Sequence, residues 1–383
     1  MVLIMNNKQY IGLVTLFRNN YGSFLQCYAL KESIEKLNFI CTVLEEKKEG
    51  KHACFEKMAD KLLIIWRSLI YRGYLTKKIK MKKAMLIEQS LLSEASREKI
   101  NKLIKSEIMP IQANWKQLLY IGQSDDYKAF IVGSDQVWNA SRNINPIFFL
   151  RFAPLNKRLT YAVSFGVSEV PNWNKRCLER GLRSFSSISI RENNATIILE
   201  NLCKNYSIEC DPALLMSPKE WRRFYEPAKA VYSQYLFAHF INEPNECAIE
   251  TIKFLSSELD LKVICFGYKH SSITALPNSF FIDGDPRDYV EMIDNSAFVC
   301  TDSFHTSLFC INLSKNFYVF ERQYLHGQPQ TGRITDLLTR YGLQDRLCNN
   351  IDGVSCTSID FFCNEKVKED REKGIRYLTN ILS

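Results

Sequence analysis

Residues 10–44, YIGLVTLFRNNYGSFLQCYALKESIEKLNFICTVL, decide the fold class of this 383-residue chain. Tyr10 to Phe17 is apolar, aromatic and β-branched, and a turn-forming Asn-Asn-Tyr-Gly follows it, which is typical of a buried strand. Ser23 to Leu37 then repeats apolar side chains at the spacing of an amphipathic helix. Phe39 to Leu44 has the composition of a second strand. A strand, a helix and a strand at this spacing predict a βαβ unit in a parallel sheet.

The alternation of strands and helices continues along the rest of the chain. Further strands are expected at 129–132, 158–165, 187–190, 235–241, 261–266, 280–282, 297–301 and 317–320. We therefore expect an α/β protein with two Rossmann-like domains that face a cleft, where such folds bind their ligands. The expected domains are 1–215, with a basic helical excursion at about 47–105, and 216–345, followed by a helical tail at 346–383.

Composition narrows the class of protein. Hydrophobic residues make up 46% and charged residues 24% of the chain, as in a globular protein, and no apolar run approaches the ~18–20 residues of a membrane span. The N-terminus has no charged leader or cleavage site, so the chain is expected to stay in the cytoplasm. Thirteen scattered cysteines and five histidines show no metal-ligand spacing, which predicts buried, reduced thiols and no metal site.

The net charge of +8 is concentrated in one segment. Between Lys47 and Lys83, twelve lysines and arginines stand against three acidic residues, and the remainder of the chain is close to neutral. A nucleic-acid-binding protein has a broader basic surface, so no nucleic-acid partner is expected. The segment also carries the apolar runs 62–66 and 69–71, and this mixture suits the surface of an anionic membrane. The alternative is a solvated, partly packed helical excursion.

Signatures of nucleotide binding are absent from the sequence. No G-x-G-x-x-G follows the first strand and no Walker A sequence occurs, so the usual phosphate-binding loops are missing. Asp283-Gly284-Asp285 has the form of the metal-binding D-x-D of some nucleotide-sugar glycosyltransferases. Because aspartate and glycine are common turn formers, we interpret it as a turn at a strand end.

Short stretches along most of the chain share an order and spacing with one known family. They are 19–30 (NNYGSFLQCYAL), 130–139 (FIVGSDQVWN), 161–166 (YAVSFG), 189–192 (SIRE), 211–215 (DPALL), 301–309 (TDSFHTSLF) and 332–334 (GRI). Together they resemble the polysaccharide pyruvyltransferase family from about residue 10 to residue 345. Any one stretch is modest support, and the ordered set is specific.

The resemblance implies a fold similar to the B-type glycosyltransferases, with the N-terminal domain on the acceptor side and the C-terminal domain on the donor side. It implies transfer of pyruvate from phosphoenolpyruvate onto a glycan or lipid-linked oligosaccharide, giving a cyclic ketal, in the biosynthesis of a surface polysaccharide such as a capsule or exopolysaccharide. No metal or cofactor is implied. At the matching positions, Arg191 would bind the donor's anionic groups and His305 would be the catalytic histidine.

Two positions depart from the pattern of that family. Some members carry arginine two residues before the histidine, where this chain has Ser303. A branch of the family has the sequence S-F-H-G, and Thr306 replaces that glycine here. A second donor-binding arginine therefore has to come from elsewhere in this chain.

The chemistry of ketal formation agrees with a role for His305. The reaction moves protons near neutral pH, for which histidine is the suited side chain. His305 is expected in the first turn of a helix, where free N–H groups and the helix dipole favour a phosphate. Ser303 is a candidate N-cap, and Thr306 and Ser307 are candidate hydroxyl donors to the donor substrate. The alternative is a histidine that only satisfies the start of a helix.

Arginines are expected to hold the donor, because a guanidinium binds carboxylate and phosphate in bidentate fashion. Arg191 stands at the end of the strand at 187–190, and its alternative role is a salt bridge to Glu192. Arg333, at the start of a helix, is a second candidate for the donor site.

Candidates for the acceptor side follow the strand at 129–132 and the first strand. Ser134, Asp135 and Gln136 are expected on a loop that faces the cleft, where Asp135 could orient or deprotonate an acceptor hydroxyl. A helix-capping aspartate is the alternative. Trp138 and Tyr21 offer flat surfaces on which sugars stack, the alternative being aromatic side chains of the core.

Two other functions remain open from the sequence. One is a nucleotide-sugar glycosyltransferase of similar architecture, and the other is a non-catalytic scaffold of a glycan-assembly complex. The presence of both Arg191 and His305 argues against the scaffold, and the absence of nucleotide and metal motifs argues against the glycosyltransferase.

Overall fold

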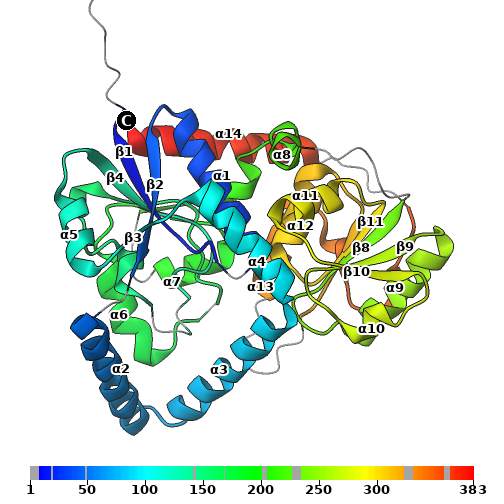
Figure 1. The fold of residues 1–383 in the computed structure, drawn as a ribbon, viewed down its shortest axis with the longest axis horizontal. Coiled ribbons are helices and arrows are strands. Elements are labelled where there is room, and N and C mark those ends of the chain that lie inside the picture. The colour runs from blue at the N-terminus through cyan, green and yellow to red at the C-terminus, as the bar shows by residue number, and fades with distance from the viewer. Residues whose placement is uncertain are drawn as a thin grey trace, which may run out of the picture.

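Two parallel β-sheets form the framework of the protein, with helices on both sides of each (Figure 1). The computed structural model describes residues 8–18, 20–47, 50–139, 141, 144–167, 169–200, 205–226, 234–322, 331–357 and 363–383. Asn19, part of the first stretch quoted above, lies outside them. The prediction of two Rossmann-like α/β domains is confirmed by the two sheets.

The first sheet has the strand order β3-β2-β1-β4-β5, and all its neighbouring strands are parallel. The central strand, β1, pairs on both sides, with Ile11 opposite Cys41 and Ala129. Gly12 in this strand allows a close approach, since an added Cβ would lie 2.4 Å from a ring carbon of Phe130. The strands are β1 (Tyr10–Val14), β2 (Ile40–Glu46), β3 (Ile111–Ala113), β4 (Tyr127–Val132) and β5 (Arg158–Thr160).

A short two-stranded sheet adjoins the first sheet at the carboxyl ends of its strands. It consists of β6 (Ile188–Ile190) and β7 (Tyr206–Ile208), which are parallel. Val163 bridges to Asp135 on one side and to Ile190 on the other, so it joins the two sheets. The helices of this half, apart from the excursion, are α1 (Tyr21–Lys36), α5 (Trp115–Gln123), α6 (Asn172–Leu182) and α7 (Thr196–Glu200).

The second sheet has the order β10-β9-β8-β11-β12-β13 and is also parallel throughout. Its strands are β8 (Tyr235–His239), β9 (Lys262–Phe266), β10 (Ser279–Ile282), β11 (Phe298–Thr301), β12 (Phe317–Phe320) and β13 (Leu347–Cys348). The helices of this half are α8 (Pro218–Tyr225), α9 (Glu246–Glu258), α10 (Ser271–Thr274), α11 (Pro286–Asp294), α12 (Phe304–Leu313) and α13 (Thr331–Tyr341).

One apolar core connects the two sheets. It runs from Ile11 in β1 through Phe24 in α1 to Tyr289 in α11 and Phe309 in α12, all of them buried. Separate core clusters lie on the other face of each sheet. The continuous cluster fixes α1 against α11 and α12, which brings the starts of α1 and α12 together.

The last helix, α14 (Cys363–Leu382), crosses back to the first domain (Figure 1). Val367, Leu378 and Leu382 on one side of it are buried, and Tyr377 donates a hydrogen bond to the carbonyl oxygen of Thr160. Residues 346–383 were expected as a helical tail. In the structure, residues 347–348 form the edge strand of the second sheet and α14 packs against both domains.

The basic excursion forms a helical hairpin, α2 (Gly50–Ile70) and α3 (Tyr74–Leu91), followed by α4 (Glu94–Leu103). A π-helical turn, Ile104–Ile108, continues α4. The end of α3 contacts the second domain, because the Ser93 N–H donates to the Gly267 carbonyl oxygen. Within the described ranges, no helix is long and apolar enough to cross a membrane.

Most predicted elements occur within a few residues of their expected bounds, with one clear exception. The strand expected at 158–165 ends at Thr160. Ala162 and Gly166 have φ angles of 47° and 65°, which a strand does not accommodate. The sequence analysis also missed β3, β7 and β13, because runs of two or three residues carry no readable alternation.

Candidate active site

A pocket forms where the strand order of both sheets reverses. The reversal lies between β1 and β4 in the first sheet and between β8 and β11 in the second, and the loops after these four strands meet. The space is about 510 Å³, open solvent at its mouth included. We call it the cleft pocket. It is lined by Asn20, Tyr21, Gly22, Asp135, Gln136, His239, Ile241, Tyr268, Tyr289, Ser303, Phe304, His305, Arg322 and Arg333.

His305 lies in the first turn of α12, at the floor of the cleft pocket. Ser303 caps the helix, since its hydroxyl oxygen accepts a hydrogen bond from the Thr306 N–H at 3.4 Å. The His305 Nε2 atom is 3.7 Å from an Asp211 carboxylate oxygen and has no hydrogen-bond partner among the described residues. Gly22 is required here, because a Cβ at this position would lie 2.1 Å from the His305 Nδ1 atom.

Burial and nearby charges determine the protonation of His305. Burial is the largest influence and lowers the pKa of the imidazole, while the carboxylates of Asp211 and Asp135 act to raise it. The guanidinium groups of Arg191 and Arg333 add to the lowering, and the net pKa lies below the ordinary value. His305 is therefore neutral near neutral pH, with an unpartnered nitrogen at the pocket.

Asp135 follows β4 and turns sharply into the pocket, with a φ angle of 66°. Its carboxylate accepts hydrogen bonds from the Ser23 hydroxyl at 2.5 Å and from the Gln136 N–H at 2.8 Å. Burial alone would raise the pKa of Asp135, but His305, Arg191 and the Ser23 hydrogen bond outweigh it and hold the pKa below its ordinary value. Asp135 caps no helix in the described structure, since residues 136–139 directly after it are not helical.

Arg191 lies behind the cleft pocket, at the end of β6. Its Nη1 atom donates to Asp211 at 2.6 Å, and its Nε atom is 3.4 Å from Glu192. Burial disfavours the charged guanidinium, but the carboxylates of Asp211, Glu192 and Asp135 outweigh this, so the pKa of Arg191 is raised. Its Nη2 atom has no hydrogen-bond partner among the described residues. Arg191 thus forms the salt bridge to Glu192 and still keeps one donor group unused.

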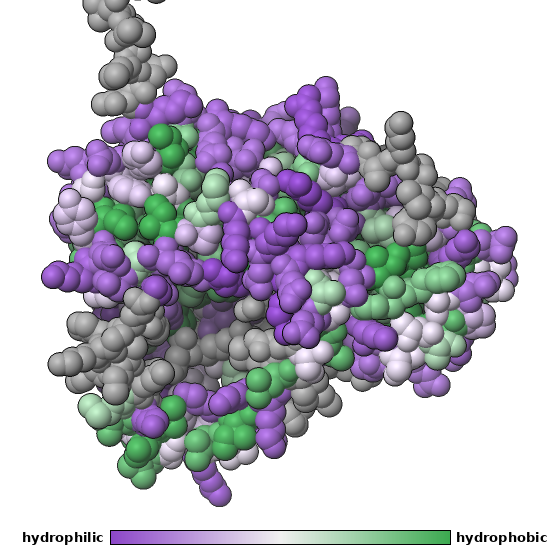
Figure 2. Space-filling view, in the orientation of Figure 1, coloured by the Kyte–Doolittle hydropathy of each residue, from purple (hydrophilic) through white to green (hydrophobic). Residues whose placement is uncertain are grey.

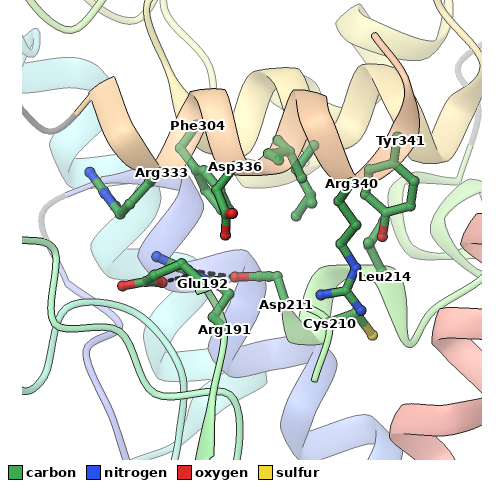
Figure 3. A pocket seen from close by; sticks show the side chains of 12 residues that line it. Arg191, Glu192, Cys210, Asp211, Leu214, Phe304, Arg333, Asp336, Arg340 and Tyr341 are labelled. Carbon is green, nitrogen blue, oxygen red and sulfur yellow. Dashed lines mark hydrogen bonds and ion pairs between the residues drawn. The ribbon is translucent and has the colours of Figure 1, made fainter. Parts of the chain in front are cut away.

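Arg191 faces a second, smaller space that we call the rear pocket (Figure 3). In Figure 3, side chains of α13 lie above it, and Arg191, Glu192 and Asp211 of the N-terminal half lie below. Phe304 and Arg333 line both pockets, and the Arg191 guanidinium carbon is 4.3 Å from the centroid of the Phe304 ring. The rear pocket is lined by Arg191, Glu192, Cys210, Asp211, Leu214, Phe304, Leu308, Arg333, Asp336, Leu337, Arg340 and Tyr341.

Of the candidates from the sequence, the structure brings Tyr21, Asp135, Gln136, Ser303, His305 and Arg333 to the cleft pocket. Tyr21 forms a wall of the pocket rather than an open platform. Its ring stacks on Tyr289 with 4.9 Å between centroids, and its hydroxyl donates to the Gly284 carbonyl oxygen. A sugar therefore cannot stack on the face of Tyr21 that Tyr289 covers.

The structure does not bring Trp138, Ser134, Thr306 and Ser307 to either pocket, although the sequence analysis expected binding roles for them. Trp138 is fully buried among Phe149, Phe165 and Phe185, and its indole N–H donates to the Phe148 carbonyl oxygen at 2.9 Å. Its indole ring belongs to the core, because burial of a large aromatic side chain contributes strongly to the stability of the fold.

The three hydroxyl groups are used inside the protein. The Ser134 hydroxyl donates to Asp211 at 3.3 Å, and the Thr306 hydroxyl shares a 2.7 Å hydrogen bond with Tyr289. The Ser307 hydroxyl donates to the Ser303 carbonyl oxygen at 3.0 Å, one turn earlier in α12. None of these three residues lines either pocket.

Three further residues were missed by the sequence analysis. Asp211 contacts both Arg191 and His305, although the DPALL stretch that contains it had already been singled out. His239 lines the cleft pocket, and burial lowers its pKa to about 3. Its Nδ1 atom is 3.2 Å from the Phe266 carbonyl oxygen, so the neutral ring carries its proton there.

Arg322 is the third missed residue, and no local signal in the sequence marks it. It follows β12 and lines the cleft pocket beside Ser303. Its guanidinium donates to the Asp302 carbonyl oxygen at 3.2 Å and lies 3.3 Å from the Asp302 carboxylate. Arg322 thus supplies a guanidinium next to position 303, where some members of the family carry an arginine.

The described residues contain no cluster of three histidine, cysteine or acidic side chains placed to hold a metal ion. Asp285 caps α11 by accepting from the Arg287 and Asp288 N–H groups. Asp283 accepts hydrogen bonds from Ser93 and Ser96. Both carboxylates of the D-x-D sequence are therefore engaged in local packing.

Fold and pocket together define a two-domain α/β protein with two histidines, two arginines and an aspartate at an interdomain cleft. The chain belongs to the polysaccharide pyruvyl transferase family, whose model matches residues 20–324. The matched part contains Asp135, Arg191, His305 and Arg322 and ends before Arg333. A search among curated proteins finds no match.

Solved structures with similar folds are distant in sequence. An S. aureus protein, MnaA, solved with UDP, is 13% identical over 97% of each chain, with a TM-score of 0.49. A UDP-N-acetylglucosamine 2-epimerase from Rickettsia bellii is 9% identical over 98% of this chain and 97% of its own, with a TM-score of 0.48. A glycosyltransferase from Rickettsia africae is 11% identical over 98% and 99%, with a TM-score of 0.46.

Proposed function

We propose that this protein transfers the pyruvyl group of phosphoenolpyruvate onto two hydroxyls of one sugar, forming a cyclic ketal. The observation that carries the proposal is the state of His305: buried, neutral and with an unpartnered Nε2 atom 3.7 Å from an Asp211 carboxylate oxygen. A neutral imidazole that lines a pocket between two domains is suited to accept and return protons. Family membership supplies the reaction class.

The bonds and protons exchanged in this reaction define what the site has to do. A proton adds to C3 of the donor, a sugar oxygen attacks C2, the bond from C2 to the phosphate oxygen breaks, and a second hydroxyl closes the ring. The two sugar hydroxyls each lose a proton. One proton is balanced by the proton added to C3, which forms the methyl group, and the other by the proton on the released phosphate. His305 would carry protons between these atoms, and Asp135 would orient or deprotonate an acceptor hydroxyl.

The guanidinium groups around the pocket are suited to the donor's carboxylate and phosphate. Arg322 and Arg333 line the cleft pocket, and Arg191 is adjacent with one unused donor group. Binding of an anion here would raise the pKa of His305, so a histidine that is neutral in the free protein would hold a proton once the donor is bound. We propose no metal or other cofactor for the reaction.

We further propose that the acceptor is a glycan or lipid-linked oligosaccharide of a surface polysaccharide, modified on the cytoplasmic side at the inner face of the membrane. The basic excursion supports a peripheral contact with that membrane, since it combines positive charge with exposed apolar side chains. The pocket is open at its mouth. A sugar chain would enter there, and the donor would lie beneath it.

The test is incubation of the protein with phosphoenolpyruvate and lipid-linked oligosaccharides, followed by mass spectrometry and a phosphate assay. We expect one pyruvate ketal on the glycan for each phosphate released. Transfer from a nucleotide-sugar instead would identify a glycosyltransferase. No modification from either donor would leave the scaffold as the better explanation.

A further inference from the structure

The hairpin α2–α3 carries an apolar face that no other part of the described structure covers. On α2, Met58, Leu62, Ile65, Trp66 and Leu69 recur every three or four residues, so they lie on one side of the helix. Each is more than half exposed, and Leu69 reaches 81%. On α3, Leu75, Ile79 and Leu86 continue the pattern at 48–56% exposure.

This apolar face is visible at the lower edge of the molecule. Figure 1 shows α2 and α3 extending below the two sheets as a V. Figure 2 shows hydrophobic side chains along this edge, over both helices, next to strongly hydrophilic ones. Soluble monomeric proteins rarely expose apolar side chains in such continuous groups, so the face indicates a partner surface.

The charge of the hairpin is entirely positive where the apolar side chains are densest. Residues 61–83 include eight lysines and arginines and no aspartate or glutamate. Lys61, Arg72, Lys80, Lys82 and Lys83 are exposed. A partner for this surface has to accept apolar side chains and carry negative charge.

Contacts with the first domain hold the hairpin in place. The Tyr74 ring packs edge-on against Trp173 of α6, with 5.4 Å between centroids, and the Lys77 ammonium lies 5.0 Å from the same ring system. Within the hairpin, the buried Arg67 guanidinium of α2 lies 5.8 Å from the Tyr74 ring of α3. These contacts occupy the inward side near the bend, so the apolar face described above is the side turned outward.

We propose that the outward face of α2–α3 docks on the surface of an anionic lipid bilayer. A second copy of the chain is the poorer occupant, because two surfaces with eight positive charges each would repel one another. A bilayer with anionic headgroups satisfies both features: apolar side chains enter the boundary of headgroups and acyl chains, and the lysines reach the phosphates. If the proposed function holds, docking brings the protein to the membrane that carries a lipid-linked acceptor.

Vesicle co-sedimentation of the full chain tests this proposal without any measurement of catalysis. We expect binding to vesicles of phosphatidylcholine with phosphatidylglycerol, weaker binding at high salt, and little binding to phosphatidylcholine alone. Lys80→Gln, Lys82→Gln and Lys83→Gln in one variant should weaken binding roughly 100-fold, at about fivefold for each lysine. The matched control replaces Lys116, Lys253 and Lys262, which are exposed elsewhere.

A second pair of variants isolates the apolar contribution. Leu62→Gln, Ile65→Gln, Trp66→Gln and Leu69→Gln together should weaken binding at least about tenfold. The control changes Met109, Leu155, Ile197 and Tyr120 to Gln, whose exposures of 60–81% match those of the first set. All eight side chains are exposed, and circular dichroism should confirm an unchanged fold.

Two results would overturn the proposal. One is equal vesicle binding by the apolar variant and its control. The other is no binding of the unmodified protein to the anionic vesicles. A dimer seen by analytical ultracentrifugation that the apolar variant abolishes would then assign the face to a second copy of the chain. Because lipid binding is measured directly, either result would contradict membrane docking without contradicting the proposed reaction. Failure to detect the reaction would likewise not contradict membrane docking.

Discussion

His305 is buried at the start of α12, and its pKa is held below the ordinary value chiefly by that burial. Under the proposed function, the residue stabilises the transition state rather than the bound donor. His305→Gln should therefore lower kcat about 10²–10⁴-fold, the usual contribution of general acid–base catalysis, while KM for phosphoenolpyruvate changes little. Steady-state kinetics with varied phosphoenolpyruvate measures both quantities.

Arg191→Ala is the contrasting variant for that experiment. Arg191 would hold the donor in the ground state as well, so its loss should chiefly raise KM. The binding free energy of the donor should weaken by about 2–5 kcal/mol if the ion pair between Arg191 and the donor is buried in the complex. Circular dichroism checks that both variants fold. Near-normal kcat in His305→Gln would exclude histidine from the chemistry, and Asp135 would be tested next.

Asp211 is expected to act through His305, to which it lies 3.7 Å. Its carboxylate raises the pKa of His305, so Asp211→Asn should lower that pKa further and leave the imidazole neutral to a lower pH. The limb of the kcat/KM profile that reports His305 in the free enzyme should therefore move to lower pH.

Glu192→Gln is the matched control for Asp211→Asn. Both carboxylates contact Arg191, but the largest charge effects on the pKa of His305 come from Asp211, Asp135, Arg191 and Arg333. The limb should stay in place in Glu192→Gln. If this limb of the kcat/KM profile does not shift in Asp211→Asn, Asp211 does not act through His305 and serves only as a structural partner of Arg191.

At the scale of elements, the starts of α1 and α12 meet inside the cleft pocket. Gly22, in the first turn of α1, leaves room for the His305 ring, with a hypothetical Cβ only 2.1 Å from Nδ1. Gly22→Ala should therefore displace His305 or α1, and we expect a loss of turnover of about 10-fold to 100-fold, because small displacements of a catalytic group are costly.

Gly353→Ala is the control for this prediction, since a Cβ there would have its nearest neighbour at 4.0 Å. It should behave as the unmodified enzyme. Urea unfolding of both variants separates a loss of stability from a loss of geometry. Unchanged turnover in Gly22→Ala would mean that the approach of the two helices does not position His305.

At the scale of the whole molecule, the cleft pocket draws its lining from both domains. A donor bound there would be selective for the native arrangement, so phosphoenolpyruvate should raise the Tm in proportion to the logarithm of its concentration above Kd. Differential scanning fluorimetry measures this, with inorganic phosphate and a nucleotide-sugar as comparison ligands. Stabilisation by the nucleotide-sugar and not by phosphoenolpyruvate would contradict the proposed donor.

Much of this architecture was predictable because strands and helices have different hydrophobic periods. β12 (Phe317–Phe320) occurs at its predicted bounds, and β9 (Lys262–Phe266) begins one residue after the start of the strand predicted at 261–266. Polar residues directly after apolar strands also indicated the site, since carboxyl ends of parallel strands meet at one edge. Asp135 was predicted in this way, whereas the role of His305 was predicted from the family resemblance and agreed with its place at a helix start after a strand.

The sequence by itself thus determined two parallel α/β domains, a family, and a histidine at the start of a helix after a strand. Only the tertiary structure decided which side chains reach the pocket. Trp138 follows Asp135 by three residues and is nevertheless buried, whereas Arg322 enters the cleft from a distant strand end. The reason is physical: local patterns report how a segment buries its apolar side, but the direction of a polar or aromatic side chain depends on neighbours brought in from elsewhere in the chain.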